Sequence, residues 1–220
     1  LALLANAQRD AGAISITPAG SDLDNNFPKI EARYTLNVGG FTFIPFGGFQ
    51  YFKVSATDTT EAAATLTDDL DIYSYVLGGV AKFNIGAAYI NLEGAWGQNW
   101  SNANWDNGAN PWSLRASSAN LDGTDDVSDA TSWLVGASVG LNFTPQLKFE
   151  LGAAYRVDDA DINGVDVVEG AAGYLQSVIT LAPGVYVIPE VGYYHYFDHP
   201  IDGDDLGYSW YAGAKWQIDF

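Results

Sequence analysis

The sequence predicts an all-β fold of antiparallel strands, and three observations support this prediction. Apolar and polar residues alternate along much of the 220-residue chain, and this two-residue period is that of a β-strand whose two faces meet different surroundings. Glycine, tyrosine and tryptophan are frequent and cysteine is absent, a composition typical of β proteins that meet an interface. No run of about 18 apolar residues occurs, which excludes a transmembrane helix.

Nine strands can be marked from the alternation. Three of them have a nearly unbroken apolar face, and they are residues 27–38, 133–143 and 147–157. The others alternate less regularly or close the chain, and they are residues 41–54, 70–84, 85–97, 170–182, 185–197 and 206–220. Pro45 and Pro189 fall inside two of these strands. Because proline has no N–H to donate, each requires a strand end, a bulge or a locally unpaired position.

The links between the strands are short and long in turn. Glycine, proline and asparagine mark the short turns, which lie at residues 39–40, around Asn84, at 144–146 and at 183–184. The long links are polar, and they are residues 55–69, 98–129, 158–169 and 198–205. Most of the 27 acidic residues lie in or beside the long links, and the net charge of −18 argues against nucleic acid as a partner. Long loops sorted to one end are typical of barrels inserted from one side of an outer membrane.

Aromatic residues gather at both ends of the apolar faces. Toward the long links they include Tyr51, Tyr73, Trp96, Trp133, Tyr155 and Trp210, and toward the short turns they include Phe143 and Phe220. A general preference of aromatic residues for strands explains their number but not their position. Two aromatic belts that flank a band of small and aliphatic residues are instead typical of a lipid-facing surface.

The opposite face of the strands is charged and polar. Its charged residues include Lys29, Glu31, Arg33, Lys82, Glu93, Lys148, Glu150, Arg156, Glu190 and Lys215. A dry core would cost several kcal/mol for each unpaired ion, so a barrel that encloses this face must enclose water. The sequence therefore predicts a transmembrane antiparallel β-barrel, with residues 1–26 as an external loop segment and residues 27–220 as strands joined by long acidic external loops. The alternative is a soluble β-sandwich binding module whose polar face meets bulk solvent.

The alternation, the sorted links and the C-terminal segment GAKWQIDF resemble Gram-negative outer-membrane porins of the general, homotrimeric type. The resemblance implies a bacterial outer-membrane protein that contacts lipid and lipopolysaccharide and forms a homotrimer. It also implies that Trp216, Ile218 and Phe220 belong to a signal read by the barrel-assembly machinery. The implied function is passive diffusion of small hydrophilic solutes and ions through a water-filled channel, without catalysis and without a required cofactor.

Two features predict the selectivity of such a channel. The acidic loops would concentrate cations at the mouth and give a mild cation preference. Basic rows near acids of the wall would orient dipolar solutes, and these rows are Lys29 with Arg33 and Lys148 with Arg156.

The strand count departs from the pattern of the family. Single-chain bacterial barrels have an even number of strands, whereas nine are visible here and the first residue is not methionine. We therefore expect the chain to be the C-terminal portion of a longer porin of about 16 strands. The alternative is a tenth strand in GAISIT, residues 12–17, which would close a smaller barrel.

The segment DDADINGVDVVEG resembles a calcium-binding loop. Its candidate ligands are Asp159, Asp161, Asn163 and Asp166. The glutamate that follows is one position too early for an EF-hand, and an Asx-rich turn has the same composition. Ca²⁺ at the acidic external loops is therefore one of two open interpretations.

Two other groups in or beside the long links carry possible chemistry. His195, Asp198 and His199 would lie at the external rim, where an Asp–His pair of the kind found in outer-membrane proteases can activate water. A rim rich in aspartate brings such neighbours together by chance, so we predict no enzyme. The tryptophans of residues 98–129 could stack on sugars, fold into the lumen or pack the loop on itself.

Overall fold

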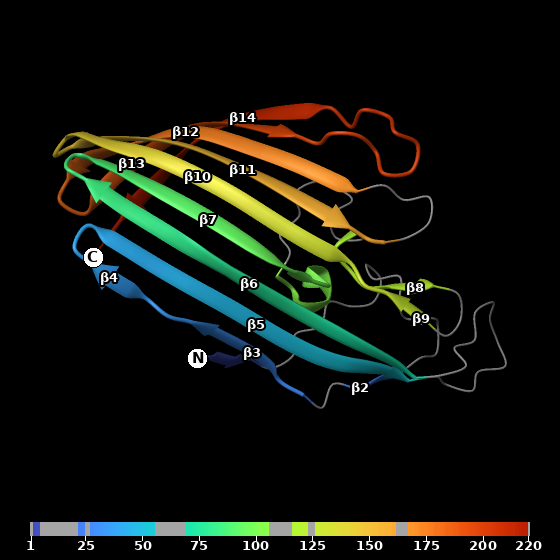
Figure 1. Cartoon of the computed structure of the whole chain (residues 1–220). Helices are drawn as coiled ribbons and strands as arrows, with labels where there is room; N and C mark the ends of the chain where they lie inside the picture. Colours follow the sequence, from blue (N-terminus) through green and yellow to red (C-terminus); the bar gives the residue numbers. More distant parts are fainter. Residues whose placement is uncertain are drawn as a thin grey trace.

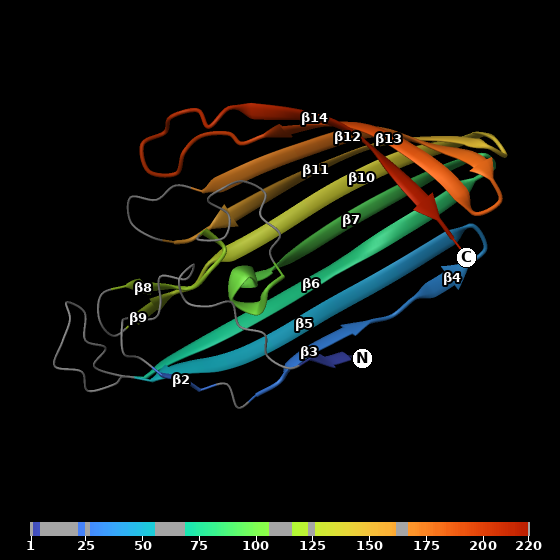
Figure 2. The ribbon, with the colours of Figure 1, turned by 180° about the vertical axis from the view of Figure 1, so that it is seen from behind.

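Antiparallel strands joined in sequence order make up almost all of the regular structure (Figures 1 and 2). A computed structural model describes residues 2–4, 22–24, 27–55, 69–105, 116–122, 126–161 and 167–219. The main sheet follows the path β1-β3-β5-β6-β7-β10-β11-β12-β13-β14, and β2 and β4 also pair with β5. Its strands are β1 (Ala2–Leu4), β2 (Asp22–Asp24), β3 (Lys29–Arg33), β4 (Leu36–Val38), β5 (Phe41–Ser55), β6 (Leu70–Ile85), β7 (Ala88–Gln98), β10 (Thr131–Thr144), β11 (Leu147–Asp159), β12 (Val168–Ala182), β13 (Val185–His195) and β14 (Tyr208–Ile218).

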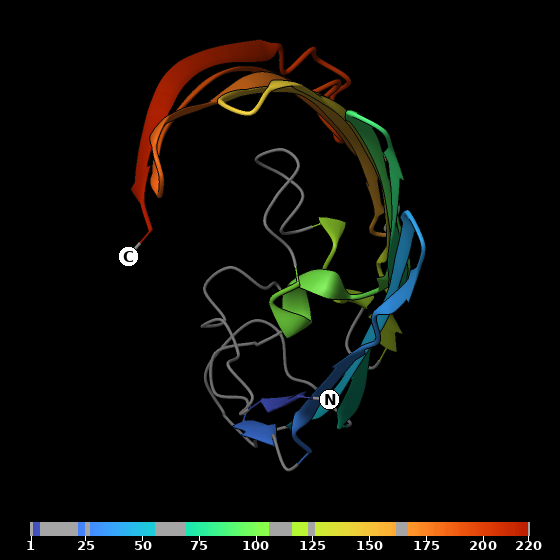
Figure 3. The same cartoon turned by 90° about the vertical axis from the view of Figure 1, so that its left-hand side faces the viewer.

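The main sheet is curved, and from the end it forms an open arc (Figure 3). The two ends of its path, β1 and β14, are not paired with each other in the described part of the chain. A short 3-10 helix, η2 (Trp100–Ala103), lies on the concave side of the arc (Figure 3). A small separate hairpin pairs β8 (Asn120–Asp122) with β9 (Asp126–Ser128). No helix among the described residues is long and apolar enough to cross a membrane.

The pairing of β10 with β11 places the alternating apolar and polar residues of the two strands on opposite faces of the sheet. Trp133 is opposite Val157 and Val139 is opposite Leu151, so the apolar residues of both strands share one face. Leu151 is 57% exposed on that face. Lys148, on the other face, is opposite Asn142. The predicted all-β, antiparallel fold is confirmed, and the apolar stripe of residues 147–157 faces outward along most of its length rather than into a core.

Positive backbone angles fix three of the four short turns. Gly39, Gly86 and Gly184 have φ values of 58°, 62° and 77°, which glycine adopts without a steric penalty. The turn that we expected around Asn84 lies two residues later, at Gly86, because Asn84 still belongs to β6 and its backbone N–H donates to Gly40 O at 2.8 Å.

Both prolines interrupt the sheet on one side only, as predicted. Tyr34 donates its N–H to Pro45 O at 3.0 Å, but Pro45 has no N–H to return, and the edge strand is divided here into β3 and β4. On its other side Pro45 keeps its register partner Gly79 in β6. Pro189 likewise keeps Ala214 in β14, whereas the pairing of β13 with β12 skips this position.

The N-terminal region contributes to the sheet. Within residues 1–26, which we expected to form an external loop, the described residues are β1 and β2, and both pair in the main sheet. β1 runs antiparallel to β3 and adds a tenth strand to the path of the sheet. The strand that we considered at residues 12–17 lies outside the described residues.

Candidate functional site

The concave face collects every charged residue that we predicted to line a lumen. Lys29 identifies this face, because its Nζ donates to Ala103 O of η2 at 3.0 Å, inside the arc. The strand registers then assign the other predicted residues to the same face, and they are Glu31, Arg33, Lys82, Glu93, Lys148, Glu150, Arg156, Glu190 and Lys215. One side of the sheet is therefore charged and the other apolar.

The convex face is apolar and open. Its exposed large side chains include Leu77, Leu92, Val135, Val139, Leu151, Leu175 and Val191. Toward the long links, aromatic rings pair across strands, with centroid distances of 5.1 Å for Tyr51–Tyr73, 5.4 Å for Tyr75–Trp96, 5.4 Å for Trp133–Tyr155 and 4.7 Å for Tyr193–Trp210. These pairs form a row of rings across the strands, and such a row is typical of a membrane interface.

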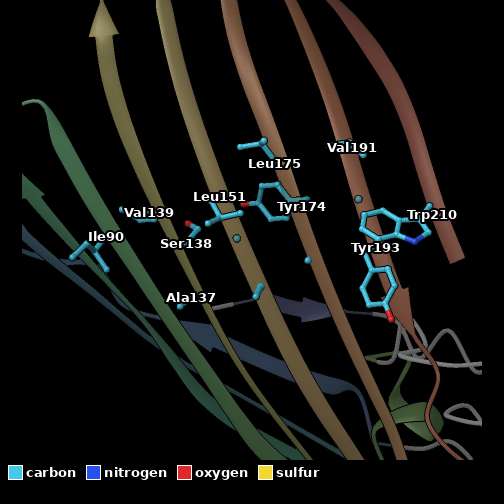
Figure 4. Close-up of a pocket in the computed structure, with 14 residues that line it drawn as sticks. Ile90, Ala137, Ser138, Val139, Leu151, Tyr174, Leu175, Val191, Tyr193 and Trp210 are labelled. Atoms are coloured by element: carbon cyan, nitrogen blue, oxygen red, sulfur yellow. The ribbon is translucent and has the colours of Figure 1, made fainter. Parts of the chain in front are cut away.

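At the short-turn end, Phe143 contacts Phe149 at 6.5 Å and Phe41 contacts Phe83 at 5.0 Å. Trp216 and Ile218 are exposed on the same convex face, while Phe220 lies outside the described residues. Figure 4 shows a shallow apolar hollow on this face, where Leu151, Leu175 and Val191 surround residues with little or no side chain.

Part of the longest link folds back onto the concave face. We call residues 99–105 and 116–120 the inward segment. Asn99 is its central residue, because its side-chain amide donates to Tyr73 O at 2.9 Å and to Asp129 Oδ1 at 2.7 Å. Its side-chain oxygen accepts the backbone N–H of Ala130 at 2.9 Å. The two parts of the segment are joined by a 2.7 Å bond between the hydroxyls of Ser101 and Ser117.

Two tryptophans fasten the inward segment to the wall. Trp105 donates its Nε1–H to Glu31 at 2.6 Å and its ring occupies the space beside Gly48, where a Cβ would clash. Trp100 is buried, and Arg156 lies over its ring at 5.2 Å. Of the roles open to the loop tryptophans, these two fold against the concave wall, and Trp112 lies outside the described residues.

The inward segment corrects our view of two predicted lumen residues. Lys29 is only 8% exposed and Arg156 only 5% exposed, because the segment covers both. Each has an acid two residues further along its strand, and the ion pairs are Lys29–Glu31 at 3.1 Å and Arg156–Asp158 at 2.8 Å. These bases hold the segment and do not face open water.

The part of the concave face that the inward segment leaves uncovered has a different chemistry. Glu150 accepts hydrogen bonds from Tyr174 at 2.8 Å, from Gln176 at 2.7 Å and from Tyr89, and Lys148 Nζ lies 3.5 Å away. We call Tyr89, Tyr174, Tyr211 and their acid partners the tyrosine wall. Sequence reasoning missed these tyrosines as a group. Each stands on the polar side of a strand directly opposite a glycine, a pairing that can be seen only once the strand register is known.

Glu150 and Tyr174 of the tyrosine wall also line a hollow that collects charges of both signs. Arg33, Lys82 and Glu93 line it together with Asn91 and Ser138. Asn91 donates to Ser138 Oγ at 2.9 Å, which fixes the polar row between the charges.

The candidate metal and catalytic residues of the links are only partly described. Asp159 Oδ1 accepts the backbone N–H of Asp161 at 3.1 Å, which is an Asx turn, and Asn163 and Asp166 lie outside the described residues. Within the described residues no group of three or more potential ligands could hold a metal ion, and Ca²⁺ binding stays a prediction.

The two histidines of the rim are engaged separately. His195 contacts the Tyr193 hydroxyl at 3.2 Å and the Phe197 ring at 4.4 Å. His199 Nδ1 lies 2.8 Å from Asp202 Oδ1. The backbone of Asp198 forms an isolated antiparallel β-bridge with that of Asp205. The described contacts therefore do not join His195, Asp198 and His199 into one site.

Comparison with solved structures relates this architecture to outer-membrane proteins. The outer membrane channel DcaP of Acinetobacter baumannii matches with a TM-score of 0.70 at 13% identity, over 93% of this chain and 55% of that chain. The outer-membrane protein OmpT of Vibrio cholerae, in its trimer form, matches with a TM-score of 0.48 at 13% identity, over 86% of this chain and 54% of that chain, which is too weak to carry an argument. No protein-family model matches the chain, and no curated protein matches it by sequence.

The likeness to the channel structure shows the fold. The sheet of this chain has the architecture of an outer-membrane β-barrel, and the chain spans about half the length of the channel that it matches.

Proposed function

We propose that the protein is a bacterial outer-membrane porin that lets small hydrophilic solutes and ions diffuse through a water-filled lumen. One observation carries this proposal: the strands expose their apolar residues on the convex face and gather their charges on the concave face. A soluble β-sandwich has the reverse need, because it must bury its apolar faces against each other. The aromatic rows at both ends of the convex face support lipid as the surrounding medium.

We also propose that the inward segment narrows the lumen and that the uncovered charges set the selectivity. With Lys29 and Arg156 covered, the bases left on the open wall include Arg33, Lys82, Lys148 and Lys215. The acidic external loops attract cations to the mouth, and we expect a mild cation preference that weakens as salt rises.

The remaining strands of the barrel belong, in this proposal, to a longer polypeptide of which this chain is the C-terminal portion. The open arc and the half-length match to the channel support it. The mature protein should then have an intact mass well above 23.6 kDa, and a mass spectrum at that value would contradict the proposal. A homotrimer, contacts with lipopolysaccharide and assembly through the C-terminal signal are proposed on the resemblance alone.

The function is tested with the full-length protein in planar lipid bilayers. We expect stepwise ohmic conductance in potassium chloride and a reversal potential on the cation side. Absence of conductance from heat-modifiable, folded protein would overturn the channel, and firm anion selectivity would overturn the cation preference.

Two adjacent substitutions test which face meets lipid. Val139→Arg puts a charge on the convex face and should reduce the free energy of unfolding by about 2–4 kcal/mol if the position is near the bilayer midplane. Ser138→Arg puts the same charge on the concave face and should change it far less, because that face meets water. Urea titration in lipid vesicles measures both, and equal losses would contradict the assignment of the faces.

A further inference from the structure

The open tyrosines of the concave wall lie flat against the sheet, and the strand register produces this arrangement. Tyr174 stands directly opposite Gly152, and Tyr211 directly opposite Gly192. A Cβ added to either glycine would clash with the facing ring, so each ring occupies the space of the missing side chain. A ring seated in this way lies along the wall and presents its face to the lumen.

A carboxylate holds the hydroxyl of each ring. Tyr174 donates to Glu150 at 2.8 Å, and Tyr211 donates to Glu190 at 2.6 Å. In both cases the acid lies two residues before the glycine on the neighbouring strand, in the segments Glu150-Leu151-Gly152 and Glu190-Val191-Gly192. The same three-part unit of acid, glycine and facing tyrosine therefore occurs twice on this wall.

The rings of Tyr174 and Tyr211 lie on the part of the wall that the inward segment leaves uncovered. A third ring, that of Tyr89, is already covered by Lys148 Nζ at 4.5 Å from its centroid. Tyr211 is 37% exposed, and the Tyr194 ring lies beside it at an interplanar angle of 29°, with centroids 5.6 Å apart. Tyr174 and Tyr211 belong to strands β12 and β14, two strand spacings apart, which is about 10 Å.

We propose that this wall binds neutral sugars during their passage, a proposal that rests on the channel function. A pyranose ring has an apolar C–H face and hydroxyl groups at its rim. The negative faces of Tyr174 and Tyr211 attract such C–H groups. The carboxylate oxygens of Glu150 and Glu190 and the side chain of Gln176 are hydrogen-bonding groups beside the rings. Lys148 compensates the charge of Glu150, so a neutral solute suits this part of the wall better than a cation.

The test measures ion current through the full-length protein in planar bilayers while maltose is added. A polyethylene glycol of equal hydrodynamic size serves as the probe that only fills volume. We expect saturable block by maltose and a merely proportional decrease with the polymer. Conductance without sugar reports the channel function by itself, so its presence together with proportional maltose block would overturn only the sugar proposal.

Variants then assign the effect to the rings. Tyr174→Leu combined with Tyr211→Leu should weaken maltose affinity at least fivefold, whereas Tyr208→Leu, on the convex face of the same strand, should leave it unchanged. Gly192→Ala keeps every tyrosine but forces Tyr211 off the wall, and it should weaken affinity about as much as loss of that ring. Unchanged affinity in a folded, conducting form of these variants, or saturable block by tetramethylammonium instead of maltose, would overturn the proposal.

Discussion

The strand β11 contains two ion pairs of the same design in different surroundings. Arg156 and Asp158 are a base and an acid two residues apart on the concave face, and so are Lys148 and Glu150. The first pair is joined at 2.8 Å and lies under the inward segment, where both side chains are almost fully buried. The second pair is joined at 3.5 Å on the uncovered wall, and about a third of the Lys148 side chain is exposed.

Because strand, face and spacing are the same, the difference between the pairs comes from what covers them. A buried pair interacts without screening, and either member left alone would be an uncompensated charge in a dry place. An open pair is weakened by water and salt, but its charges act on solutes that pass. The covered pair therefore anchors the inward segment, and the open pair contributes to the field of the lumen.

The largest effect is expected from Arg156→Met. The substitution removes the base that pairs with the buried Asp158 and the cation that lies over Trp100, so the free energy of unfolding should fall by about 3–5 kcal/mol. Urea titration in lipid vesicles measures this loss. Lys148→Met is the matched control, and its free energy of unfolding should fall by about 1 kcal/mol or less. Equal losses in the two variants would show that the cover does not distinguish the pairs.

A smaller effect is expected from Asn99→Ala in the inward segment. The carbonyl group of Tyr73 and the buried N–H of Ala130 lose their hydrogen-bond partner, which should cost about 1–3 kcal/mol of unfolding free energy. Asn84→Ala is the control. Because Asn84 is exposed, this substitution should lower the free energy of unfolding by no more than about 0.5 kcal/mol. If the two variants lose the same free energy of unfolding, the inward segment is not fixed by Asn99.

The smallest effect on stability, but a specific one on selectivity, is expected from Lys148→Met. Removal of an exposed base from the wall should move the reversal potential toward stronger cation preference at low salt. The shift should shrink between about 0.1 M and 1 M salt, because the screening length falls from about 10 Å to about 3 Å. A shift that persists at high salt would mean that Lys148 is shielded from the lumen water.

The faces of the strands could be predicted from the sequence because the two-residue period survives in most of them. The period is weak at the long-link ends of β5 and β6, and the structure explains why. There Tyr51 and Tyr73 face outward, while Phe52 and Ile72 face inward and pack under Ala119 of the inward segment. Both faces are apolar at this end, so no alternation remains to be seen.

The covered and the open parts of the concave face could not be told apart from the sequence. The inward segment is held by contacts distant along the chain, such as the bond from Trp105 to Glu31, which joins residues 74 positions apart. No local pattern marks such a contact. The tyrosine wall escaped notice for a related reason, since the pairing of Tyr211 with Gly192 depends on exact register, which the periodicity alone does not give.

The strand order also limits how the arc can become a ring. Each strand along its path runs opposite to its neighbour, so β1 at one border and β14 at the other point in opposite directions. An all-antiparallel ring can then accept only an even number of extra strands between these borders. Were they supplied by polypeptide that precedes β1, that polypeptide would enter the ring on the short-turn side, where β14 also finishes. Beginning and end of the barrel wall would meet at one rim, and the opposite rim would consist of loops alone.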